Sequence, residues 1–487
     1  MAQQATELRY AVRLRVVLKY FGQLCLVLAA LTLVPLVVAV AFGETATSLR
    51  YGLLIGGLVI VGAGLGRLRV PAMVQANEAM VVVALIFLCT PLVMSYPMMA
   101  AGMGFLDAFF EAISGVTTTG LSTKETLVDA PASFLFARSW MQWYGGLGIL
   151  VFSLALVLHP GLAAKGLTAT EAESDDLVGG TRAHARQILE VYALLTVLGI
   201  VGCWAVGVGL LDALHYTFAA VSTGGFAPSD SSLASFGWPA QAWISLLCLA
   251  AAVPLTFYPR MFQENRRGAL ERLQVLALLL ALLVVSLAVG ATMRWSGGLT
   301  WSQVLHNAPL FAFSAQTTAG FSSMSCAELD AGSKLVLILS MLVGGGVGST
   351  AGGIKVLRLF IAISVLRVVV LRTCLPKHTV LEPRLAGRQV QDAQIRTALL
   401  LILLFVTVVA LSWLPFVAMG FDPLDSLFEV VSATGTVGLS AGLSSPTLPA
   451  VLKGVLCVDM LMGRLEIIAW LVMLYPGTWF GRRMEDL

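Results

Sequence analysis

The sequence predicts an all-α polytopic membrane protein, with two N-terminal helices and four pseudo-symmetric helix–pore-loop–helix repeats around one central pore. Three observations support this class: the composition, a series of apolar runs, and a motif that occurs four times. Of the 487 residues, 58% are hydrophobic and 12% are charged. Soluble domains carry about 25% charged residues. The composition therefore excludes a soluble enzyme, a disordered chain and a nucleic-acid-binding module.

Ten segments are candidates for membrane-spanning helices, which need about 20 mostly apolar residues. Eight are charge-free runs: 20–43, 79–106, 139–164, 191–211, 231–259, 273–293, 335–354 and 397–421. A ninth, 51–66, is shorter, and a tenth, 449–480, carries charges. The first run could also be a signal peptide, because Ala39-Val40-Ala41 resembles a cleavage site. Its length exceeds the usual apolar region of about 7–15 residues, so we predict a retained helix.

The distribution of Lys and Arg predicts the orientation of these ten spans. If the N-terminus is inside, the inner segments hold 23 of the 30 Lys and Arg residues. Cytoplasmic loops carry the excess of Lys and Arg, so both termini are predicted to be cytoplasmic. The outer segments then carry twelve carboxylates against five cations. Such a face would concentrate cations at a pore mouth, although ordinary polar loops would give the same count.

One 16-residue motif occurs four times, each time between two spanning runs. The copies are DAFFEAISGVTTTGLS (107–122), DALHYTFAAVSTGGFA (212–227), NAPLFAFSAQTTAGFS (307–322) and DSLFEVVSATGTVGLS (425–440). Asp or Asn begins each copy, and Gly follows 13 residues later. The residue two before that Gly is always Thr: Thr118, Thr223, Thr318 and Thr436. The agreement at four places indicates an internal fourfold repeat.

Each copy predicts a half-helix followed by an extended strand. Asp or Asn is a preferred N-cap, and about nine mostly apolar residues follow, enough for two to three turns but too few to span. A Thr-Gly stretch then ends the helix. Non-helical backbone at membrane depth is tolerated only where it is buried in protein or lines a water-filled cavity. Four such strands are therefore expected to form a ring around one axis.

Such a ring suits a monovalent cation. Backbone carbonyl groups can replace the hydration shell of an ion, and Gly adopts the positive φ that brings carbonyl groups inward. The sequences TTTG, STGG, TTAG and GTVG contain no carboxylate, whereas Ca²⁺ and Mg²⁺ usually recruit carboxylates or keep water ligands. The alternative is that Thr and Gly only allow close helix packing, which does not account for four copies with one spacing.

Residues 344–353 (GGGVGSTAGG) predict a break in the middle of a span. Each Gly costs about 1 kcal/mol relative to Ala in a helix. The segment is neither a Walker A motif, because Ile354 separates Gly353 from Lys355, nor a GxGxxG fingerprint, because no strand precedes it. A flexible barrier across the inner pore and a static kink are the two interpretations. The candidate gating residues are Gly344, Gly345, Gly346, Gly348, Ser349, Thr350, Gly352, Gly353 and Lys355.

Arg464 is a second candidate for the inner pore. An intramembrane charge is costly and usually faces an interior cavity or a partner. Arg464 lies 15 residues after Pro449, inside the last apolar stretch. The alternative to a pore position is an ion pair with Asp459 or Glu466.

The four copies resemble the pore loops of the Trk/Ktr/HKT superfamily of potassium transporters. RSWMQWYGGLGI (138–149), GGGVGSTAGGIKVLR (344–358) and GRLEI (463–467) are similar to the TrkH-type membrane subunits of bacterial Trk systems. The resemblance implies potassium uptake across the bacterial inner membrane, with potassium as the transported ion and no organic cofactor. It implies an intramembrane gating loop with Lys355 at its cytoplasmic end, and Arg464 projecting into the pore to limit flow. It also implies a homodimer and a peripheral TrkA-type nucleotide-binding partner.

The resemblance assigns the filter to carbonyl groups at twelve positions. They are Thr118, Thr119, Gly120, Thr223, Gly224, Gly225, Thr318, Ala319, Gly320, Thr436, Val437 and Gly438. Gly at all four final positions resembles the potassium-selective members. The expected segments are two N-terminal helices (1–71) and repeats at 72–165, 166–268, 269–375 and 376–487.

Other functions remain as alternatives. A proton- or sodium-coupled potassium symporter could use the same scaffold, because coupling is a kinetic property. A membrane-embedded protease would need a Ser-His or paired-Asp arrangement, and none is evident. A passive scaffold gives no reason for four similar loops. The sequence contains no soluble nucleotide-binding domain, so a response to nucleotide requires a partner. The segment 355–396, with eight Lys and Arg residues, is a candidate docking surface, although the positive-inside rule alone accounts for its charge.

Overall fold

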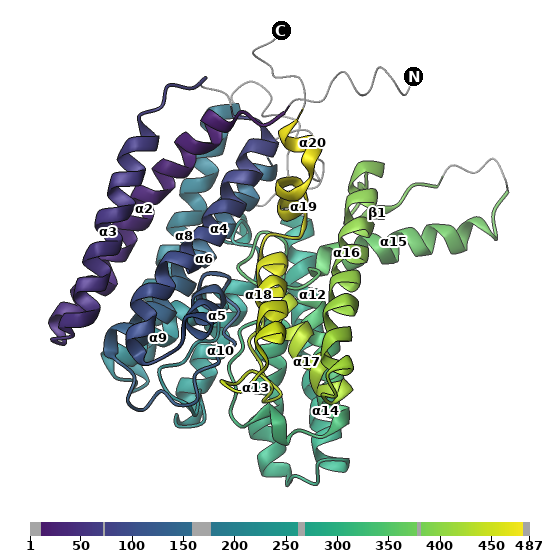
Figure 1. Cartoon of the computed structure of the whole chain (residues 1–487). Coiled ribbons are helices and arrows are strands. Elements are labelled where there is room, and N and C mark those ends of the chain that lie inside the picture. The colour runs from purple at the N-terminus through teal and green to yellow at the C-terminus, as the bar shows by residue number, and fades with distance from the viewer. Residues whose placement is uncertain (1–10, 72–73, 158–176, 262–267, 377–380, 481–487) are drawn as a thin grey trace. The chain divides into compact units, whose positions relative to one another are not determined.

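The computed structural model describes residues 11–71, 74–157, 177–261, 268–376 and 381–480 (Figure 1). These residues form helices and loops, with one short hairpin in which Arg384–Leu385 (β1) pairs with Arg388–Gln389 (β2) in antiparallel orientation. The predicted all-α class is therefore confirmed. The chain divides into two compact units. The first contains residues 1–113, 130–137 and 465–487, and the second contains 114–129 and 138–464.

The first unit is built mainly from long apolar helices. Its elements are α2 (Leu14–Ala41), α3 (Thr45–Gly66), α4 (Ala76–Met98), η1 (Met99–Ala101), most of α5 (Phe105–Val116), the start of α6 (Ala132–Val157), α19 (Ile468–Leu474) and α20 (Pro476–Trp479). Helices α2 and α3 pack so closely that a Cβ on Gly62 would lie 2.8 Å from the carbonyl oxygen of Gly22. Small residues allow membrane helices to approach in this way. The short run predicted at 51–66 thus belongs to a helix of 22 residues, which is long enough to span.

A buried ion pair joins the residues that precede α2 to the first turn of α4. Arg13 donates from Nε and Nη2 to the two carboxylate oxygens of Glu78, at 2.8 and 2.9 Å. The backbone N–H groups of Arg13 and Gln75 donate to the same carboxylate, at 3.1 and 2.8 Å. Glu78 is fully buried and Arg13 is 6% exposed. These additional hydrogen bonds offset the cost of removing both charges from water.

The second unit contains three trios of helices. Its elements are α8 (Leu177–Ala205), α9 (Leu210–Val221), α10 (Trp238–Ala252), α11 (Phe257–Met261), α12 (Ala269–Trp295), α13 (Trp301–Thr317), η3 (Cys326–Glu328), α14 (Ala331–Val343), α15 (Val356–Arg372), α16 (Asp392–Ala418), α17 (Pro423–Thr434) and α18 (Ala450–Arg464). Within each trio, α8–α9–α10, α12–α13–α14 and α16–α17–α18, all three helices contact one another. Each trio is a long helix, a shorter helix and a returning helix, as the repeat predicts.

The predicted N-caps of the half-helices are wrong in position. Three aspartates occupy the third helical position instead: Asp107 of α5, Asp212 of α9 and Asp425 of α17. The cap of α17 is Asp422, whose carboxylate accepts hydrogen bonds from the N–H groups of Leu424 and Asp425, at 2.9 and 3.0 Å. A carboxylate in the first turn is stabilised by the helix dipole as well as at the cap. The motif aspartate therefore marks the first turn and not the cap.

The third half-helix departs further from the prediction. Helix α13 has 17 residues, and Thr300 is its N-cap, with a capping box completed by Gln303. Asn307 consequently lies inside the helix. Because the capping box supplies acceptors for the first N–H groups, the helix begins earlier than the repeat motif.

Three helix interruptions shape the second unit and its boundary. The predicted break at 344–353 is confirmed, since α14 ends at Val343 and α15 begins at Val356. Two other breaks were not predicted. Helix α10 ends at Ala252, and Pro254 explains the stop because the residue before a proline disfavours helical backbone. Helix α18 ends at Arg464. Shortly after it, Glu466 and Ile467 have positive φ values of 56° and 64°, which a right-handed helix does not contain.

Six helices of the described ranges are long and apolar enough to cross a membrane: α2, α3, α4 with η1, α12, α16, and the part of α8 from Ala185 to Ala205. The remaining predicted spans correspond to α6 and to the interrupted helices α10, α14–α15 and α18–α19.

Candidate functional site

The four repeats share one backbone geometry where the motif threonine stands. The φ values are 54° at Thr118, 52° at Thr223, 56° at Thr318 and 49° at Thr436, all in the left-handed region. In the first repeat, the N–H of Thr118 donates to Gly115 O at 3.0 Å and that of Thr119 to Ser114 O at 2.9 Å. The other three repeats have the same pair of bonds, which closes a helix C-terminus as a Schellman motif. A β-branched residue is strained in this conformation, so its fourfold use indicates a role for the side chain.

The four motif glycines form a closed ring of contacts. Their φ values are 94° at Gly120, 76° at Gly225, 71° at Gly320 and 93° at Gly438. A Cβ would lie 2.2 Å from Gly224 O at Gly120, 2.4 Å from Ala319 O at Gly225, 2.3 Å from Val437 O at Gly320, and 2.1 Å from Thr119 O at Gly438. Each glycine thus abuts the carbonyl group that precedes the glycine of the next repeat, and the fourth repeat returns to the first. Side chains at these positions would force the ring apart.

The threonine hydroxyl groups have different surroundings. Thr223 donates to Ser222 O at 2.7 Å, and the hydroxyl of Thr318 accepts a hydrogen bond from Gly352 N–H at 2.8 Å. The hydroxyls of Thr118 and Thr436 are buried and have no hydrogen-bond partner among the described residues. Buried polar groups are normally hydrogen-bonded. These two oxygens therefore fit a mobile partner such as water or a passing cation.

Gln142 of α6 holds the strand of the second repeat. Its Nε2 donates to Gly224 O, and its Oε1 accepts from Phe226 N–H at 3.1 Å. The two bonds bracket Gly225. Gln142 is fully buried, and nothing in the repeat motif pointed to it. It lies in the segment RSWMQWYGGLGI, so its position in that segment was the only available signal.

The glycine-rich segment 344–355 is anchored to the second and third repeats. Gly346 N–H donates to Ala252 O at 3.0 Å, and Thr350 donates to Ala251 O through N–H at 3.3 Å and Oγ1 at 3.1 Å. The N–H of Leu255 in turn donates to Gly348 O at 3.1 Å. The two acceptors, Ala251 and Ala252, are the last two residues of α10. Because the helix stops there, their carbonyl groups are available to hold this segment.

The same segment reaches the ring strands of the third and fourth repeats. Besides the bond from Gly352 to Thr318, a Cβ on Gly352 would lie 2.1 Å from Gly435 O and 2.3 Å from Thr436 Oγ1. Gly344, Gly348 and Gly353 have φ of 67°, 81° and 75°. The other predicted gating residues lie in the same turns. Ser349 donates to Gly346 O at 2.7 Å, Gly345 O accepts from Val356 N–H, and Lys355 has φ of 76°.

Arg464, the last residue of α18, holds the glycine-rich segment from the fourth repeat. Its Nη1 donates to Thr350 O at 2.9 Å and its Nη2 to Gly145 O at 3.5 Å. The side chain is 4% exposed, and its Nε has no partner in the described ranges. Asp459 instead accepts a hydrogen bond from Ser412 at 2.5 Å. The alternative of an ion pair between Arg464 and Asp459 is therefore wrong.

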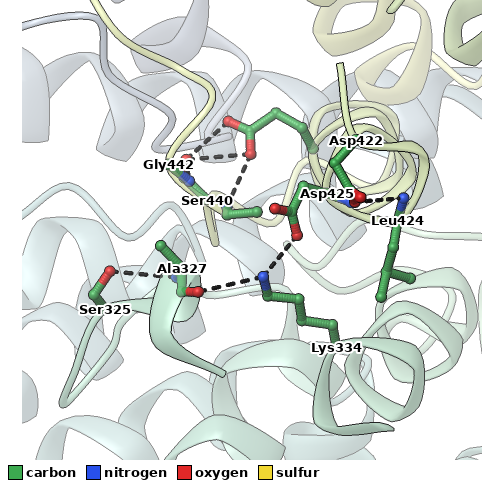
Figure 2. A network of polar contacts seen from close by, with 10 residues as sticks. Ser325, Ala327, Lys334, Asp422, Leu424, Asp425, Ser440 and Gly442 are labelled. Carbon is green, nitrogen blue, oxygen red and sulfur yellow. Dashed lines mark hydrogen bonds and ion pairs between the residues drawn. The ribbon is translucent and has the colours of Figure 1, made fainter. Parts of the chain in front are cut away.

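An ion pair and a buried carboxylate support the loops that follow the ring (Figure 2). Lys334 Nζ, at the start of α14, donates to Asp425 Oδ1 at 2.6 Å and to Ala327 O at 3.3 Å. Glu429 of α17 is fully buried and accepts from Ser440 Oγ at 2.9 Å and from Ala441 N–H at 2.9 Å. These contacts fix the N-terminal end of α17 and the strand that leaves the ring.

The chemistry of this site is that of neutral oxygen atoms. The twelve ring residues are the predicted filter positions 118–120, 223–225, 318–320 and 436–438, and they carry no ionisable side chain. No group of three or more His, Cys, Asp or Glu side chains that could hold a metal ion occurs in the part of the chain that the structure describes. Carbonyl and hydroxyl oxygens can replace water around a weakly hydrated cation. The arrangement therefore suits transient binding of an ion and not a resident metal.

Fold and site together define a class, an all-α polytopic membrane protein in which loops of four repeats converge on one ring. The profile of the TrkH family, described as a cation transport protein, matches residues 71–263 and 302–476. The chain belongs to the TrkH family of cation transport proteins, which are transporters and not enzymes.

Individual relatives agree with this assignment. The chain is 31% identical over 479 residues to the Trk system potassium uptake protein TrkI of Halomonas elongata, covering 95% of this chain and 96% of that protein. It is 27% identical over 385 residues to the Trk system potassium uptake protein TrkH of Escherichia coli K12, covering 77% and 79%. The crystal structure of the potassium transporter TrkH from Vibrio parahaemolyticus aligns with a TM-score of 0.82 and 24% identity, covering 96% of this chain and 100% of that one. That likeness shows the fold.

Proposed function

We propose that this chain takes up potassium across the bacterial inner membrane through a channel-like pore, with both termini cytoplasmic. The ring of four glycines, each against a carbonyl group of the next repeat, is the observation that carries the proposal. Rings of backbone carbonyl groups from four loops can replace the hydration shell of a cation in a selectivity filter. The names of the relatives, which are potassium uptake proteins of Trk systems, support potassium as the transported ion.

The selectivity filter in this proposal consists of the twelve ring residues. Carbonyl oxygens of the strands replace water around the ion, and the positive φ of each Gly allows the strands to approach closely. The hydroxyl groups of Thr118 and Thr436, which have no hydrogen-bond partner within the described ranges, offer further oxygen ligands at the start of the strands. No protein charge competes with the ion at these positions, so a monovalent cation can both enter and leave.

The gate in this proposal is the segment 344–355 together with Arg464. The segment bonds to the ring through Gly352 and Thr318, and Arg464 holds it through Thr350. Its positive charge would also repel a cation that leaves the filter. Opening requires Arg464 to release Thr350 O, and glycine-rich backbone gives the segment the freedom to move.

The assembly in this proposal is a homodimer with a peripheral TrkA-type nucleotide-binding subunit. The relatives are named as parts of a Trk system, which supports additional components. The basic segment 355–396 is the proposed docking surface, and Arg367, Arg372 and Arg384 within it are exposed. Exposed arginines suit an acidic partner surface because they bind carboxylates bidentately.

Ion flux into proteoliposomes tests the function. The purified chain is reconstituted, and influx of K⁺ and of radioactive Rb⁺ is measured against increasing Na⁺ outside, with protein-free vesicles as the control. We expect saturable K⁺ influx that Na⁺ inhibits weakly and that needs no gradient of H⁺ or Na⁺. Influx equal to the control would overturn the proposal. An absolute requirement for a proton or sodium gradient would replace the channel with a coupled symporter.

A further inference from the structure

The residue six positions before each ring glycine has the same backbone role in all four repeats. These residues are Ser114, Ala219, Ser314 and Ser432. Each carbonyl oxygen accepts a hydrogen bond from the N–H of the residue just before the glycine, at 2.9, 2.7, 2.9 and 2.8 Å in chain order. The backbone is therefore matched among the repeats, and the repeats differ in the hydrogen bond that the side chain at this position makes.

The side chains divide the four repeats into two kinds. Ser114 Oγ accepts a hydrogen bond from Gly120 N–H at 3.0 Å, and Ser432 Oγ accepts one from Gly438 N–H at 3.0 Å. Ala219 has no hydroxyl group. Ser314 has one, but its Oγ is buried without any hydrogen-bond partner in the described ranges. The first and fourth repeats thus carry a serine clamp on the ring glycine, and the second and third do not.

The clamp fixes the direction of a carbonyl group. The N–H of Gly120 and the C=O of Thr119 belong to one planar peptide unit, in which they point in opposite directions because the bond is trans. A hydrogen bond from this N–H back to Ser114 therefore turns the C=O of Thr119 away from the half-helix. The same argument links Ser432, Gly438 and Val437. Thr119 O and Val437 O are two of the four carbonyl oxygens in the ring contacts.

The other two repeats hold their strands differently. In the second, Gln142 donates to the carbonyl oxygen of Gly224 itself. In the third, the strand is bonded through Thr318 to Gly352 of the glycine-rich segment. The clamped pair also shares one junction of the ring, since a Cβ on Gly438 would lie 2.1 Å from Thr119 O. At this junction Ser114 sets the carbonyl group of Thr119 and Ser432 holds the peptide N–H of the facing Gly438. The carbonyl oxygen of Val437 lies at the next junction, against Gly320 of the third repeat.

We propose that Ser114 and Ser432 are positioning residues that set the ion selectivity of the pore by orienting the carbonyl groups of Thr119 and Val437. The proposal rests on the proposed function, in which these carbonyl groups face the ion. The two serines do not touch the ion. They act through the peptide unit of the neighbouring glycine, and the serine of the third repeat, Ser314, does not share this role.

The experiment compares Ser114→Ala, Ser432→Ala and Ser314→Ala in the reconstituted full-length chain. Each variant is first checked for a monodisperse species by size-exclusion chromatography. Rb⁺ influx is then measured at increasing Na⁺, which gives a maximal rate and a Na⁺ inhibition constant for each protein. A residue with only a structural role lowers the maximal rate through the amount of assembled protein. It does not change the ratio of Na⁺ inhibition constant to Rb⁺ half-saturation constant.

We expect this ratio to fall about fivefold in Ser114→Ala and in Ser432→Ala, because each loses one hydrogen bond that orients a ligand. Ser314→Ala keeps the ratio of the unsubstituted chain, since its hydroxyl bonds nothing in the ring. An unchanged ratio in both clamp variants, or an equal fall in all three, overturns the proposal. Failure of both clamp variants to assemble while Ser314→Ala assembles also overturns it, because it assigns these serines to folding. Absence of Rb⁺ influx in the unsubstituted chain would overturn the proposed function, and this inference with it.

Discussion

Arg464 and Thr350 are 114 positions apart in the sequence, and the Nη1 of the arginine donates to the carbonyl oxygen of the threonine at 2.9 Å. The bond joins the end of α18 to the glycine-rich segment between α14 and α15. It is a hydrogen bond from a charged donor in a buried place, the kind whose loss is most strongly felt. In the proposed function, this hydrogen bond links the backbone of the gating segment to the side chain of Arg464.

Substitution of Arg464 by Ala is expected to raise K⁺ influx. The change removes one hydrogen bond to the segment, at Thr350 O, one to Gly145 O of α6, and a buried positive charge. A hydrogen bond to a charged group contributes about 1.5–3 kcal/mol, so the open fraction should rise about tenfold. Influx into proteoliposomes without any partner protein measures it. Arg464→Lys keeps the charge but not the planar fork of donors, and should give a smaller rise. Unchanged influx in Arg464→Ala would remove this residue from the gate.

Substitution of Thr318 by Ala is expected to loosen the same segment from the ring. The hydroxyl of Thr318 accepts a hydrogen bond from Gly352 N–H at 2.8 Å. A neutral hydrogen bond of this kind contributes about 1 kcal/mol, so basal influx should rise about fivefold. Thr318→Ser keeps the acceptor oxygen and should behave as the unsubstituted chain. If the two variants show equal influx, the hydroxyl does not hold the segment.

Substitution of Gly120 by Ser is expected to lower discrimination of K⁺ over Na⁺ sharply. A Cβ at this position would lie 2.2 Å from Gly224 O, so the first and second strands must separate. Gly207→Ser is the matched control, because Gly207 has φ of 91° and a Cβ there would meet no atom within 4 Å. Both variants carry the backbone strain of a side chain at positive φ, about 1–2 kcal/mol. Ion-competition flux separates them, and an equal loss of selectivity would attribute the effect to strain alone.

The parts of this structure that the sequence predicted are those repeated within it. Four copies of one motif located the threonines and glycines of the ring, because independent copies agree only where a common geometry requires it. The break at 344–353 was predicted for a local reason, the helix cost of successive glycines. Pro254 gave an equally local signal for the end of α10, and the apolar run around it concealed that signal.

The contacts that the sequence did not reveal join distant positions. Gln142 and Gly224 are 82 positions apart, and no local sequence pattern indicates that the glutamine holds the strand of the second repeat. The end of α18 also lacks a signal, since neither Gly nor Pro stands at Leu465, Glu466 or Ile467. The N-caps were misplaced because Asp is favourable both at the cap and in the first turn. Such choices depend on tertiary contacts.

The ion pair between Lys334 and Asp425 is expected to stabilise the second unit, and loss of the two partners is expected to have unequal costs. Lys334 is 8% exposed and Asp425 is 26% exposed. Asp425→Asn leaves the more deeply buried charge, that of Lys334, without its ion-pair partner. We expect this variant to lower the free energy of unfolding by about 2 kcal/mol or more, and by more than Lys334→Met does. The double variant removes both charges and should cost less than the sum of the single variants. Apparent unfolding midpoints in detergent, at one scan rate, measure the differences. Additive costs would show that the two groups do not interact.

Cysteine labelling tests the orientation and the closure of the outer loops in one experiment. Cys374, which follows α15, is exposed, whereas Cys326 of η3 is buried. Burial also raises the pKa of the Cys326 thiol to about 12. The thiolate is the reactive species, so Cys326 should stay unlabelled even at pH 9, well below that pKa.

A membrane-impermeant maleimide should therefore label Cys374 in inside-out vesicles and not in intact spheroplasts, and Cys374→Ser should abolish the labelling. Labelling of Cys374 from outside would reverse the predicted topology, because the basic segment 355–396 and both termini share one side in that prediction. Labelling of Cys326 from outside would show instead that the loop after the third ring strand opens to solvent.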